Sequence, residues 1–550
     1  MAKFGFILIC VAVAIITFVV DPFAHHSFTA PKHQLLIIIA PLLLLFPIWR
    51  RKAWVFGLIP GLFFIRILWL GVINPEWITH PGNDSFFLYL SLLLVLLAVT
   101  QFNFRNYTRF YFLTLFLIGI LETAVGIWQL TIYTPDPTAP MKTAMVGTLG
   151  TSNGVGLLLV ISLIAGMVLL KEVSTKWQQI GIAAGLLFIL SGVGLSESRG
   201  ALLALFTAGI ITGSIFFYVS NKHILVKLKK YVAWIFTGLV FLSVALVYGL
   251  YSIDQESSRG RLMVWNISGE MMQEQPFTGI GQGNYAVEYL DYQADFLADS
   301  ARSHLHYKAA NLKQAHNEFF QAFVEGGIPG GVLFFLIWLL PLLYGMKRCI
   351  QSKQINWNLV AVLAIHISII THCLVDSPLH VLPIAVIGYI NLSMIPMPKK
   401  EFRLLLTSKI FMIVVLLIYT GFATYRASKL YPAYHEWKKG SELADREEWN
   451  PAVFHYQQAL SKFGKKGGLE FNLGAAMVFN GQYSRGIYYL NQAKKDFNDR
   501  NIYLAESYAN IQLQNYKAAE RLAKQALKMF PDWLFRSYSA THFGGYSATF

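Results

Sequence analysis

Long apolar segments separated by short polar connections make up most of the chain before about residue 426. A helix needs about 20 apolar residues to cross a bilayer. About thirteen segments approach that length, and they begin near residues 4, 34, 53, 86, 110, 153, 178, 200, 231, 327, 357, 380 and 409. The pattern predicts an all-α fold, with a polytopic bundle of about 13 transmembrane helices in residues 1–426.

The first apolar segment, MAKFGFILICVAVAIITFVVDPF, resembles a signal peptide in length and in its single lysine. No small-x-small cleavage site follows it, so we interpret it as the first membrane span.

Basic residues alternate from one connection to the next. One set of short connections is rich in Lys and Arg, as at Arg50–Lys52 and in residues 222–230, whereas the alternate set holds only Lys32, Lys142 and Arg199. Because Lys and Arg concentrate on the cytoplasmic side, this asymmetry predicts a cytoplasmic N-terminus. The large loop, residues 251–326, and the C-terminal residues then lie outside.

The composition changes after about residue 426, where charged positions take helical spacing and a repeat appears. Trp449, Tyr483 and Tyr516 are 34 and 33 positions apart. Small residues keep the same offsets: Ala452, Gly486 and Ala519; Ala459, Ala493 and Ala526; Gly440 and Gly474. This period predicts a tetratricopeptide-like α-solenoid over residues 427–535, with a generic helical domain as the alternative. Residues 536–550 have no period and are left unassigned.

Composition and charge agree with a membrane protein. Only 14% of the 550 residues are charged, against about 25% in soluble domains. The net charge of +15 is explained by the basic connections, so nucleic acid is not an expected partner. The three cysteines form no CxxC pair, which gives no support for a disulfide framework or a zinc ribbon.

Three external segments carry candidate chemistry, because charges that persist beside spans are often functional. The first is SESRGALLAL, in which Arg199 begins a span; a headgroup anchor is the alternative interpretation. The second, residues 257–285, begins with Arg259 and Arg261.

Residues 257–285 predict a helix on the membrane surface or against the bundle, with Leu262, Trp265 and Met272 on one face. The glycines that follow, Gly279, Gly281 and Gly283, predict a tight turn. A nucleotide-binding loop is disfavoured because no strand precedes them.

The third segment is AHNEFFQAFVEGGIPGG, residues 315–331. His316 and Asn317 open a short helix, Glu325 lies near its end, and Gly326, Gly327 and Pro329 break it before the next span. A lone external histidine is often only a surface or packing residue. His304 and His306 lie nearby, but their spacing fits no strong zinc pattern, so no metal site is expected.

The order of these segments resembles the O-antigen ligase and polymerase superfamily, which includes bacterial O-oligosaccharyltransferases. The matching motifs are SxSRG at Ser196–Gly200, GRxxxW at Gly260–Trp265, a glycine-rich PxxGxGxxNY-like stretch at Pro276–Tyr285 and HNxxxQxxxExGxxG at His316–Gly330. Two further stretches, VGTLGTSNGVG at 146–156 and THCLVDSPLH at 371–380, resemble family motifs with departures: Ser152 replaces Asn, and Asp376 stands where Glu is usual. The resemblance covers roughly residues 85–400.

The resemblance implies a metal-independent glycosyltransferase without a cofactor in the bacterial inner membrane, with a periplasmic active site. The donor would be a glycan on undecaprenyl diphosphate, and the acceptor a hydroxyl of lipid A core or of a protein. Guanidinium groups match phosphate oxygens, so Arg199 and Arg261 are candidates for binding the diphosphate and stabilising the transition state. His316 is the candidate general base.

Further residues of the same motifs are candidates for substrate binding: Arg259, Trp265, Asn317, Gln321 and Glu325. Membrane lipids and a protein partner of the C-terminal repeats are expected to bind as well. A structural role for Glu325 remains open.

Other functions remain open at this stage. An O-antigen polymerase or a protein O-oligosaccharyltransferase would share the mechanism. A transporter of lipid-linked glycans is disfavoured because no inverted repeat is evident. A non-catalytic assembly factor is disfavoured by two arginines and a histidine on one side of the membrane.

Overall fold

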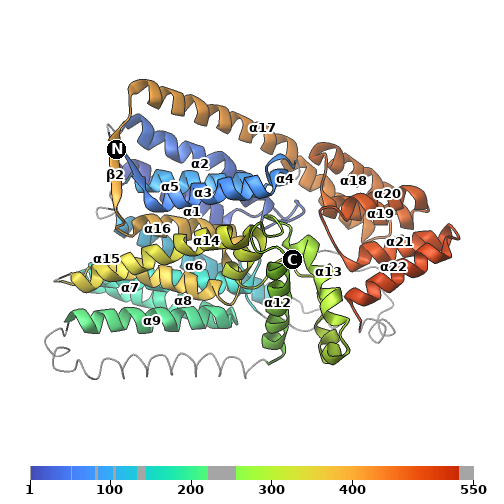
Figure 1. Ribbon diagram of the computed structural model, residues 1–550. Coiled ribbons are helices and arrows are strands. Elements are labelled where there is room, and N and C mark those ends of the chain that lie inside the picture. Colours follow the sequence, from blue (N-terminus) through green and yellow to red (C-terminus); the bar gives the residue numbers. More distant parts are fainter. Residues whose placement is uncertain are drawn as a thin grey trace.

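The computed structural model describes residues 2–50, 53–80, 84–102, 107–132, 144–220, 255–352 and 354–531. In these ranges the regular elements are helices, apart from one pair of short strands. The span expected near residue 231, the basic residues of 222–230 and the terminal residues 536–550 lie outside the described residues. The described helices form a bundle, a transverse layer and a C-terminal domain, seen from left to right in Figure 1.

The bundle contains the apolar helices. In its N-terminal half these are α1 (Ala2–Phe18), α2 (Ala30–Arg50), α3 (Leu58–Ile73), α5 (Ser85–Thr100), α6 (Thr108–Ile132) and α7 (Ser152–Glu172). The others are α8 (Lys176–Leu195), α9 (Arg199–Ser220), α14 (Glu318–Gln351), α15 (Trp357–Cys373), α16 (Leu382–Met394) and the first part of α17 (Leu406–Ala444). Helices α7, α15 and α16 lie at its centre, where nearly every residue of α16 is buried.

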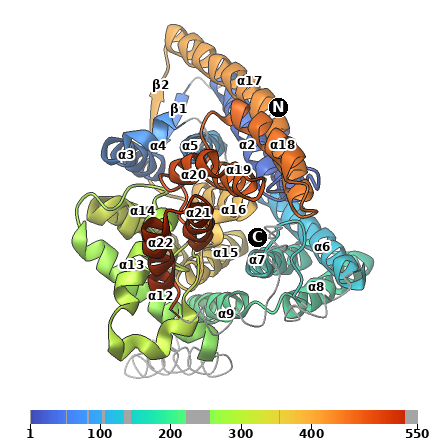
Figure 2. The same ribbon diagram turned by 90° about the vertical axis from the view of Figure 1, so that its right-hand side faces the viewer.

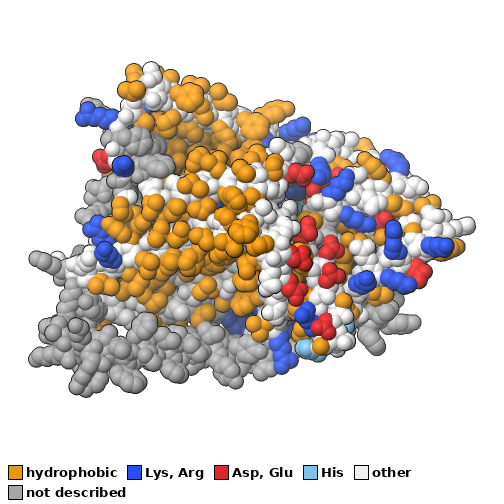
Figure 3. Space-filling model, viewed as in Figure 1, with side chains coloured by type: hydrophobic (Ala, Val, Ile, Leu, Met, Phe, Trp, Pro, Cys, Tyr) orange, Lys and Arg blue, Asp and Glu red, His pale blue; other side chains and the backbone are white. Residues whose placement is uncertain are grey.

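The protein is a multi-pass membrane protein. In the described ranges, seven helices are long and apolar enough to cross a membrane, namely α2, α6, α7, α8, α9, α14 and α17, and α1, α3, α5, α15 and α16 are shorter apolar helices. The expected number of about 13 spans therefore stays a prediction. Figure 3 shows a broad hydrophobic surface over the bundle, with basic side chains at its left margin and mixed charges on the C-terminal side.

A two-stranded antiparallel sheet joins distant parts of the chain at the end of the bundle opposite the C-terminal domain (Figure 1). Strand β1 (Ala53–Gly57) pairs with β2 (Lys399–Arg403) in the register Ala53–Arg403 to Gly57–Lys399. The apolar helix expected to begin near residue 53 begins instead at Leu58, because the preceding five residues satisfy their backbone groups in this sheet.

A transverse layer of helices occupies the position of the expected large loop. It contains α12 (Gln255–Glu274), α13 (Tyr285–Leu297) and the 3-10 helix η2 (Ser300–Lys308), together with the short α4 (Pro75–Thr79). Helix α12 runs across the direction of the bundle helices in Figure 1, as expected for a helix parallel to the membrane surface.

The buried face of α12 differs from the one predicted from the sequence. Met263, Val264, Ile267 and Met271 form the buried face, whereas Leu262 is 47% exposed. Trp265 and Met272 are partly buried against the same core, so the prediction was wrong for Leu262 alone. Helix α12 packs against α13 and α14 together, which sets its buried side.

The C-terminal domain consists of helix pairs. The end of α17 pairs with α18 (Trp449–Phe463), α19 (Gly467–Phe479) with α20 (Tyr483–Ala493), and α21 (Arg500–Gln512) with α22 (Tyr516–Met529). Trp449, Tyr483 and Tyr516 each begin the second helix of a pair, so the period seen in the sequence is the period of these pairs.

The small residues of the repeat lie where paired helices cross. A Cβ on Gly440 would lie 2.6 Å from the Tyr456 ring, and one on Gly474 would lie 3.0 Å from the Gly486 carbonyl oxygen. These contacts account for the regular small residues, and a stack of three such pairs agrees with a tetratricopeptide-like arrangement, which we retain as a proposal.

The C-terminal domain is joined to the bundle by the continuous helix α17. Residue 427 lies inside α17, which continues from the bundle into the first helix pair. Apolar residues of α12, α13 and α20–α22 share one core cluster, and Gln293 donates a hydrogen bond to the Met529 carbonyl oxygen at 3.0 Å. The domain is therefore packed against the transverse layer, where α22 lies beside α13 (Figure 1 and Figure 2).

Candidate functional site

His316 sits immediately before α14 in an unusual backbone conformation, with φ of 51°. A left-handed conformation is uncommon for a residue with a Cβ and is found at functional sites more often than elsewhere. Asn317 caps α14 by accepting a hydrogen bond from the Phe320 amide at 3.0 Å. Its side-chain amide also donates to the Leu374 carbonyl oxygen at 3.0 Å, which ties His316 to the loop after α15.

That loop supplies a carboxylate to His316. Nδ1 of His316 lies 3.1 Å from Oδ1 of Asp376, and Nε2 of His372 lies 3.7 Å from Oδ2 of the same residue. Burial raises the pKa of Asp376, but contacts with His316 and His372 outweigh it and hold the pKa well below its usual range. The His316 side chain is 35% exposed and that of Asp376 is 14% exposed, so the histidine is the more exposed partner of the ionised Asp376 carboxylate.

Arg199 begins α9 next to this pair. A Cβ on Gly200 would lie 3.0 Å from the His372 ring, so α9 begins close to His372 and glycine avoids a tight contact there. Ser198 donates a hydrogen bond to Asn153 at 3.0 Å, which fixes the start of α9 against the start of α7. The SxSRG motif and the His316 segment, 117 positions apart, therefore meet through His372 and Asp376.

Helix α12 approaches His316 from the transverse layer. The indole Nε1 of Trp265 donates a hydrogen bond to the Ala315 carbonyl oxygen at 3.0 Å. Arg261 precedes Trp265 by one helical turn and shares its face, whereas Arg259 is exposed and lies on another part of the helix surface. The arrangement places Arg261, rather than Arg259, on the face of α12 that meets the His316 segment.

The first turns of α14 contain an internal polar network. Gln321 accepts a hydrogen bond from the Ala315 amide and donates to Glu325, both at 3.1 Å. Gln282 donates to the other carboxylate oxygen of Glu325. Because Gln321 and Glu325 are buried and use their polar atoms on the protein, these contacts favour a role in positioning the His316 segment.

A break in α14 brings the glycine-rich turn into this network. Gly327 has φ of 63° and ψ of −173°, so α14 is interrupted where the sequence predicts it. Gly279, Gly281 and Gly283 also have positive φ, which confirms a tight turn. The amide of Gly281 donates to the Glu325 carbonyl oxygen at 3.0 Å, so the turn replaces a hydrogen-bond partner that the helix lacks at its break.

Two features of the site were missed in the sequence. In the sequence, Asp376 was noted only because it replaces the usual Glu of a motif, and its pairing with His316 was not predicted. A carboxylate four positions after His372, at the end of a span, could have indicated it. The second is the pair of Glu318 and His380, with Nδ1 of His380 3.2 Å from the carboxylate. Burial lowers the pKa of His380, but Glu318 outweighs this effect and raises the pKa to about 9.

His304 and His306, the histidines considered as metal ligands in the sequence, lie away from the His316–Asp376 pair. His304 and His306 contact the carbonyl oxygens of Ala301 and Leu297 around η2. Across the described ranges, no three His, Cys, Asp or Glu side chains are grouped closely enough to hold a metal ion. Metal independence stays a prediction, to be tested by chelation.

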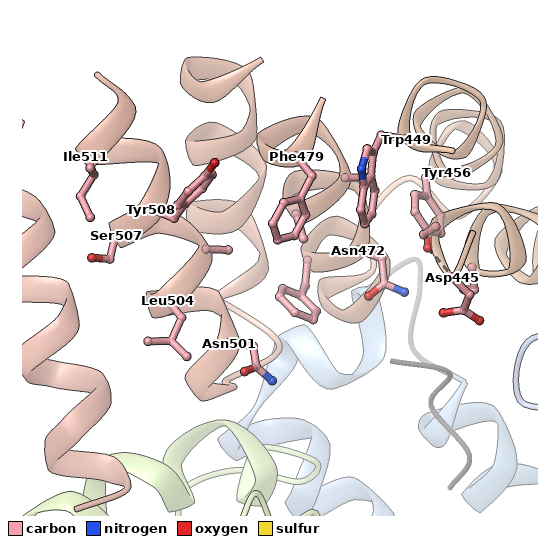
Figure 4. Close-up of a pocket in the computed structure, with 16 residues that line it drawn as sticks. Asp445, Trp449, Tyr456, Asn472, Phe479, Asn501, Leu504, Ser507, Tyr508 and Ile511 are labelled. Carbon is pink, nitrogen blue, oxygen red and sulfur yellow. Dashed lines mark hydrogen bonds between the residues drawn. The ribbon is translucent and has the colours of Figure 1, made fainter. Parts of the chain in front are cut away.

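The C-terminal domain contains a groove of its own. It has a volume of about 420 Å³ and is lined by the end of α17 and by α18, α19 and α21. Figure 4 shows Trp449, Phe479 and Tyr508 along this groove, with Asn472 and Asn501 beside them. Trp449 and Phe479 are stacked, with ring centroids 4.9 Å apart. We call it the C-terminal groove.

The geometry defines a membrane-embedded helical protein with a histidine–carboxylate pair and arginines at one end of its bundle. Residues 183–335 match the model of a family described as O-antigen ligase. This match supports a relationship with the O-antigen ligase and polymerase superfamily, and it contains Arg199, Arg261 and His316. No curated protein matches the chain.

Proposed function

We propose that the protein transfers a glycan from undecaprenyl diphosphate to an acceptor hydroxyl at the periplasmic face of a bacterial inner membrane. The observation that carries the proposal is the His316–Asp376 pair, which His372 connects to the start of α9 beside Arg199. The family match over α8–α14 supports the same reaction class.

The histidine can act as a general base. With Nδ1 held by the ionised Asp376, its proton lies on the side of the carboxylate, and Nε2 is left as an acceptor. The acceptor hydroxyl gives its proton to Nε2 as its oxygen forms a bond to the anomeric carbon. The bond from that carbon to the phosphate oxygen breaks, and its electron pair leaves with the lipid diphosphate.

The two arginines stabilise the negative charge that develops on the leaving group. A guanidinium group can donate two parallel hydrogen bonds to phosphate oxygens, so Arg199 and Arg261 stabilise the leaving diphosphate more than the intact donor. Asn317, Gln321, Glu325 and Trp265 contribute by holding the His316 segment in place.

Products in a cell distinguish the three related reactions. Deletion of the gene followed by analysis of lipopolysaccharide and glycoproteins gives a ligase pattern if capped lipid disappears and long lipid-linked chains accumulate. Caps of one repeat unit indicate a polymerase, and normal lipopolysaccharide with unglycosylated proteins indicates an oligosaccharyltransferase. Normal products of all three kinds would contradict the proposed function.

The C-terminal groove favours the protein acceptor as the second candidate. Its aromatic and aliphatic lining suits a protein segment with apolar side chains. Purified protein incubated with lipid-linked glycan and either lipid A core or a candidate protein decides between these acceptors.

A further inference from the structure

A chamber adjoins the His316–Asp376 pair on the side of the C-terminal domain. Its volume is about 490 Å³, within the usual range for small-ligand sites. It lies where the outer ends of α2, α5 and α7 and the 376–383 segment meet Tyr434 of α17 and Lys466 before α19. Asp376 and His380 are part of its wall, so the chamber reaches the carboxylate that holds Nδ1 of the proposed base, His316. We call it the interdomain cavity.

The lining of the interdomain cavity contains more cations than anions. Lysines enter from three separate segments, at Lys32, Lys313 and Lys466. The carboxylates in the lining are Asp84 and Asp376, and both are already engaged by the protein. Asp84 forms an ion pair with Arg426 and accepts a hydrogen bond from Gln34 at 2.8 Å, while Asp376 is bound by His316.

Lys32 is held in position by the protein itself. Its ammonium group donates to the carbonyl oxygens of Thr17, Val19 and Thr148, each at 2.9 Å. The Glu122 carboxylate lies close enough to interact electrostatically with this ammonium group. The charge of Lys32 is therefore partly balanced within the protein.

Lys313 and Lys466 lie in a poorly hydrated environment. Burial lowers the pKa of both lysines, and the nearest carboxylates, Asp499 for Lys313 and Asp84 for Lys466, offset this only in part. A bound anion would supply the electrostatic stabilisation that water no longer provides. His380 adds a further cation at neutral pH, because its pKa is raised to about 9 by Glu318 against the effect of burial.

We propose that the interdomain cavity binds an acidic sugar, one that carries a carboxylate or a phosphate, and holds it beside His316. The anionic group lies between Lys313 and Lys466, which come from the transverse layer and the C-terminal domain. The polar lining at Thr29, Ser85 and Ser377 suits sugar hydroxyl groups. The inference rests on the proposed glycosyl transfer, for which it names a feature of the donor glycan or the acceptor.

A binding experiment on the full-length protein tests this inference without the transfer reaction. The protein is placed in nanodiscs of phosphatidylcholine and titrated calorimetrically with a galacturonic acid trisaccharide and with its neutral methyl ester. We expect the acid to bind at least about tenfold more tightly than the ester, since a charge-assisted hydrogen bond is replaced by a weaker contact. Equal binding of the two would overturn the inference.

Matched variants locate the site. Lys466→Gln and Lys313→Gln should each weaken binding of the acid about tenfold. Lys524→Gln makes the same change of charge on the exposed surface of α22 and should leave it unchanged. Unaltered binding by both cavity variants, with normal gel-filtration profiles, contradicts the cavity as the site.

Competition separates a sugar from other anions. Inorganic phosphate that displaces the acid at equal concentration, or phosphatidylglycerol nanodiscs that abolish its binding, would point to a simple anion or lipid headgroup site and overturn the inference. Transfer assays then show whether the donor glycan or the acceptor carries the acidic sugar. A raised KM of Lys466→Gln for an acidic acceptor, or for an acidic donor, supports the inference and tells which substrate carries the acid. Transfer between neutral substrates tests the glycosyltransferase function separately.

Discussion

Asp376 holds Nδ1 of His316 at 3.1 Å although the two residues are 60 positions apart in the chain. The carboxylate belongs to the loop after α15 and the histidine to the segment before α14, so neither local sequence specifies the pair. A carboxylate in this position fixes both the tautomer and the orientation of a histidine ring. In the proposed reaction, the position of this one loop therefore governs whether His316 can accept a proton.

His316→Ala should remove transfer while the protein still inserts and purifies normally. Loss of a general base costs about 10²–10⁴-fold in rate. The measurement is transfer from purified lipid-linked glycan to acceptor in nanodiscs. His304→Ala is the matched control, because His304 is an exposed external histidine that contacts only a carbonyl oxygen near η2. Normal transfer by His316→Ala would eliminate this residue as the base.

Asp376→Asn should also reduce the rate by about 10²–10⁴-fold. The asparagine amide would donate to Nδ1 and move the ring proton to Nε2, the position that must accept a proton. Asp376→Glu restores a carboxylate and should retain more activity than Asp376→Asn. The single-turnover transfer rates of the two variants are compared. Equal rates would show that the charge of the Asp376 carboxylate does not contribute to transfer.

Arg199→Lys and Arg261→Lys should each lose most transfer activity. Lysine keeps the charge but cannot donate two parallel hydrogen bonds to a diphosphate. Arg485→Lys, an exposed exchange on α20, serves as the control for expression and folding. The prediction for either site fails if its lysine variant transfers glycan at the rate of the unmodified protein.

The Glu318–His380 pair predicts a pH-dependent stability. The pKa of His380 is raised from 6.5 to about 9, with burial opposing and Glu318 favouring the charged form. A raised histidine pKa contributes stability that is fully present below pH 6.5 and is lost as the pH rises through about 9. Thermal unfolding in detergent should therefore occur at lower temperature as the pH rises across this window. His380→Asn should reduce that dependence, and an unchanged pH profile would contradict the pairing.

Phe479→Ala and Tyr508→Ala should weaken use of the natural acceptor if the C-terminal groove binds it. Both aromatic side chains are partly exposed along the groove, and truncation of a central aromatic contact often costs tenfold or more in affinity. Tyr488→Ala, an exposed aromatic change on α20 outside the groove lining, is the control. Initial rates against acceptor concentration should show a raised KM for the groove variants alone.

A truncation near residue 430 is a poor test of the same idea. Removal of α18–α22 would expose Tyr289, Phe296 and the rest of the core that α13 shares with the C-terminal domain. Loss of activity would then report on folding, so point variants in the groove are preferable.

The sequence was sufficient to predict the features that depend on local periodicity. Apolar length predicted the bundle, a 34-residue period predicted the helix pairs, and Gly326, Gly327 and Pro329 predicted the interruption of α14. These patterns are readable because each arises from neighbours one or two turns away.

Features that depend on long-range packing could not be predicted in this way. The buried side of α12 is set by its packing against α13 and α14, which the sequence does not place. The start of the third apolar helix is displaced by a strand that pairs with residues 399–403. Asp376 becomes a partner of His316 only when α14 and α15 are brought together, and no spacing in the sequence indicates this contact.

The length of α17 sets the distance between the bundle and the first helix pair of the C-terminal domain. Its 39 residues correspond to about 58 Å at about 1.5 Å per residue, of which about 30 Å spans a bilayer's hydrocarbon core. The remainder carries the first helix pair outward without an intervening hinge loop. The C-terminal groove is thereby held at a set distance from the lipid. In the proposed transfer, an acceptor bound in the groove would be selected by the reach of its hydroxyl to His316 as well as by its surface.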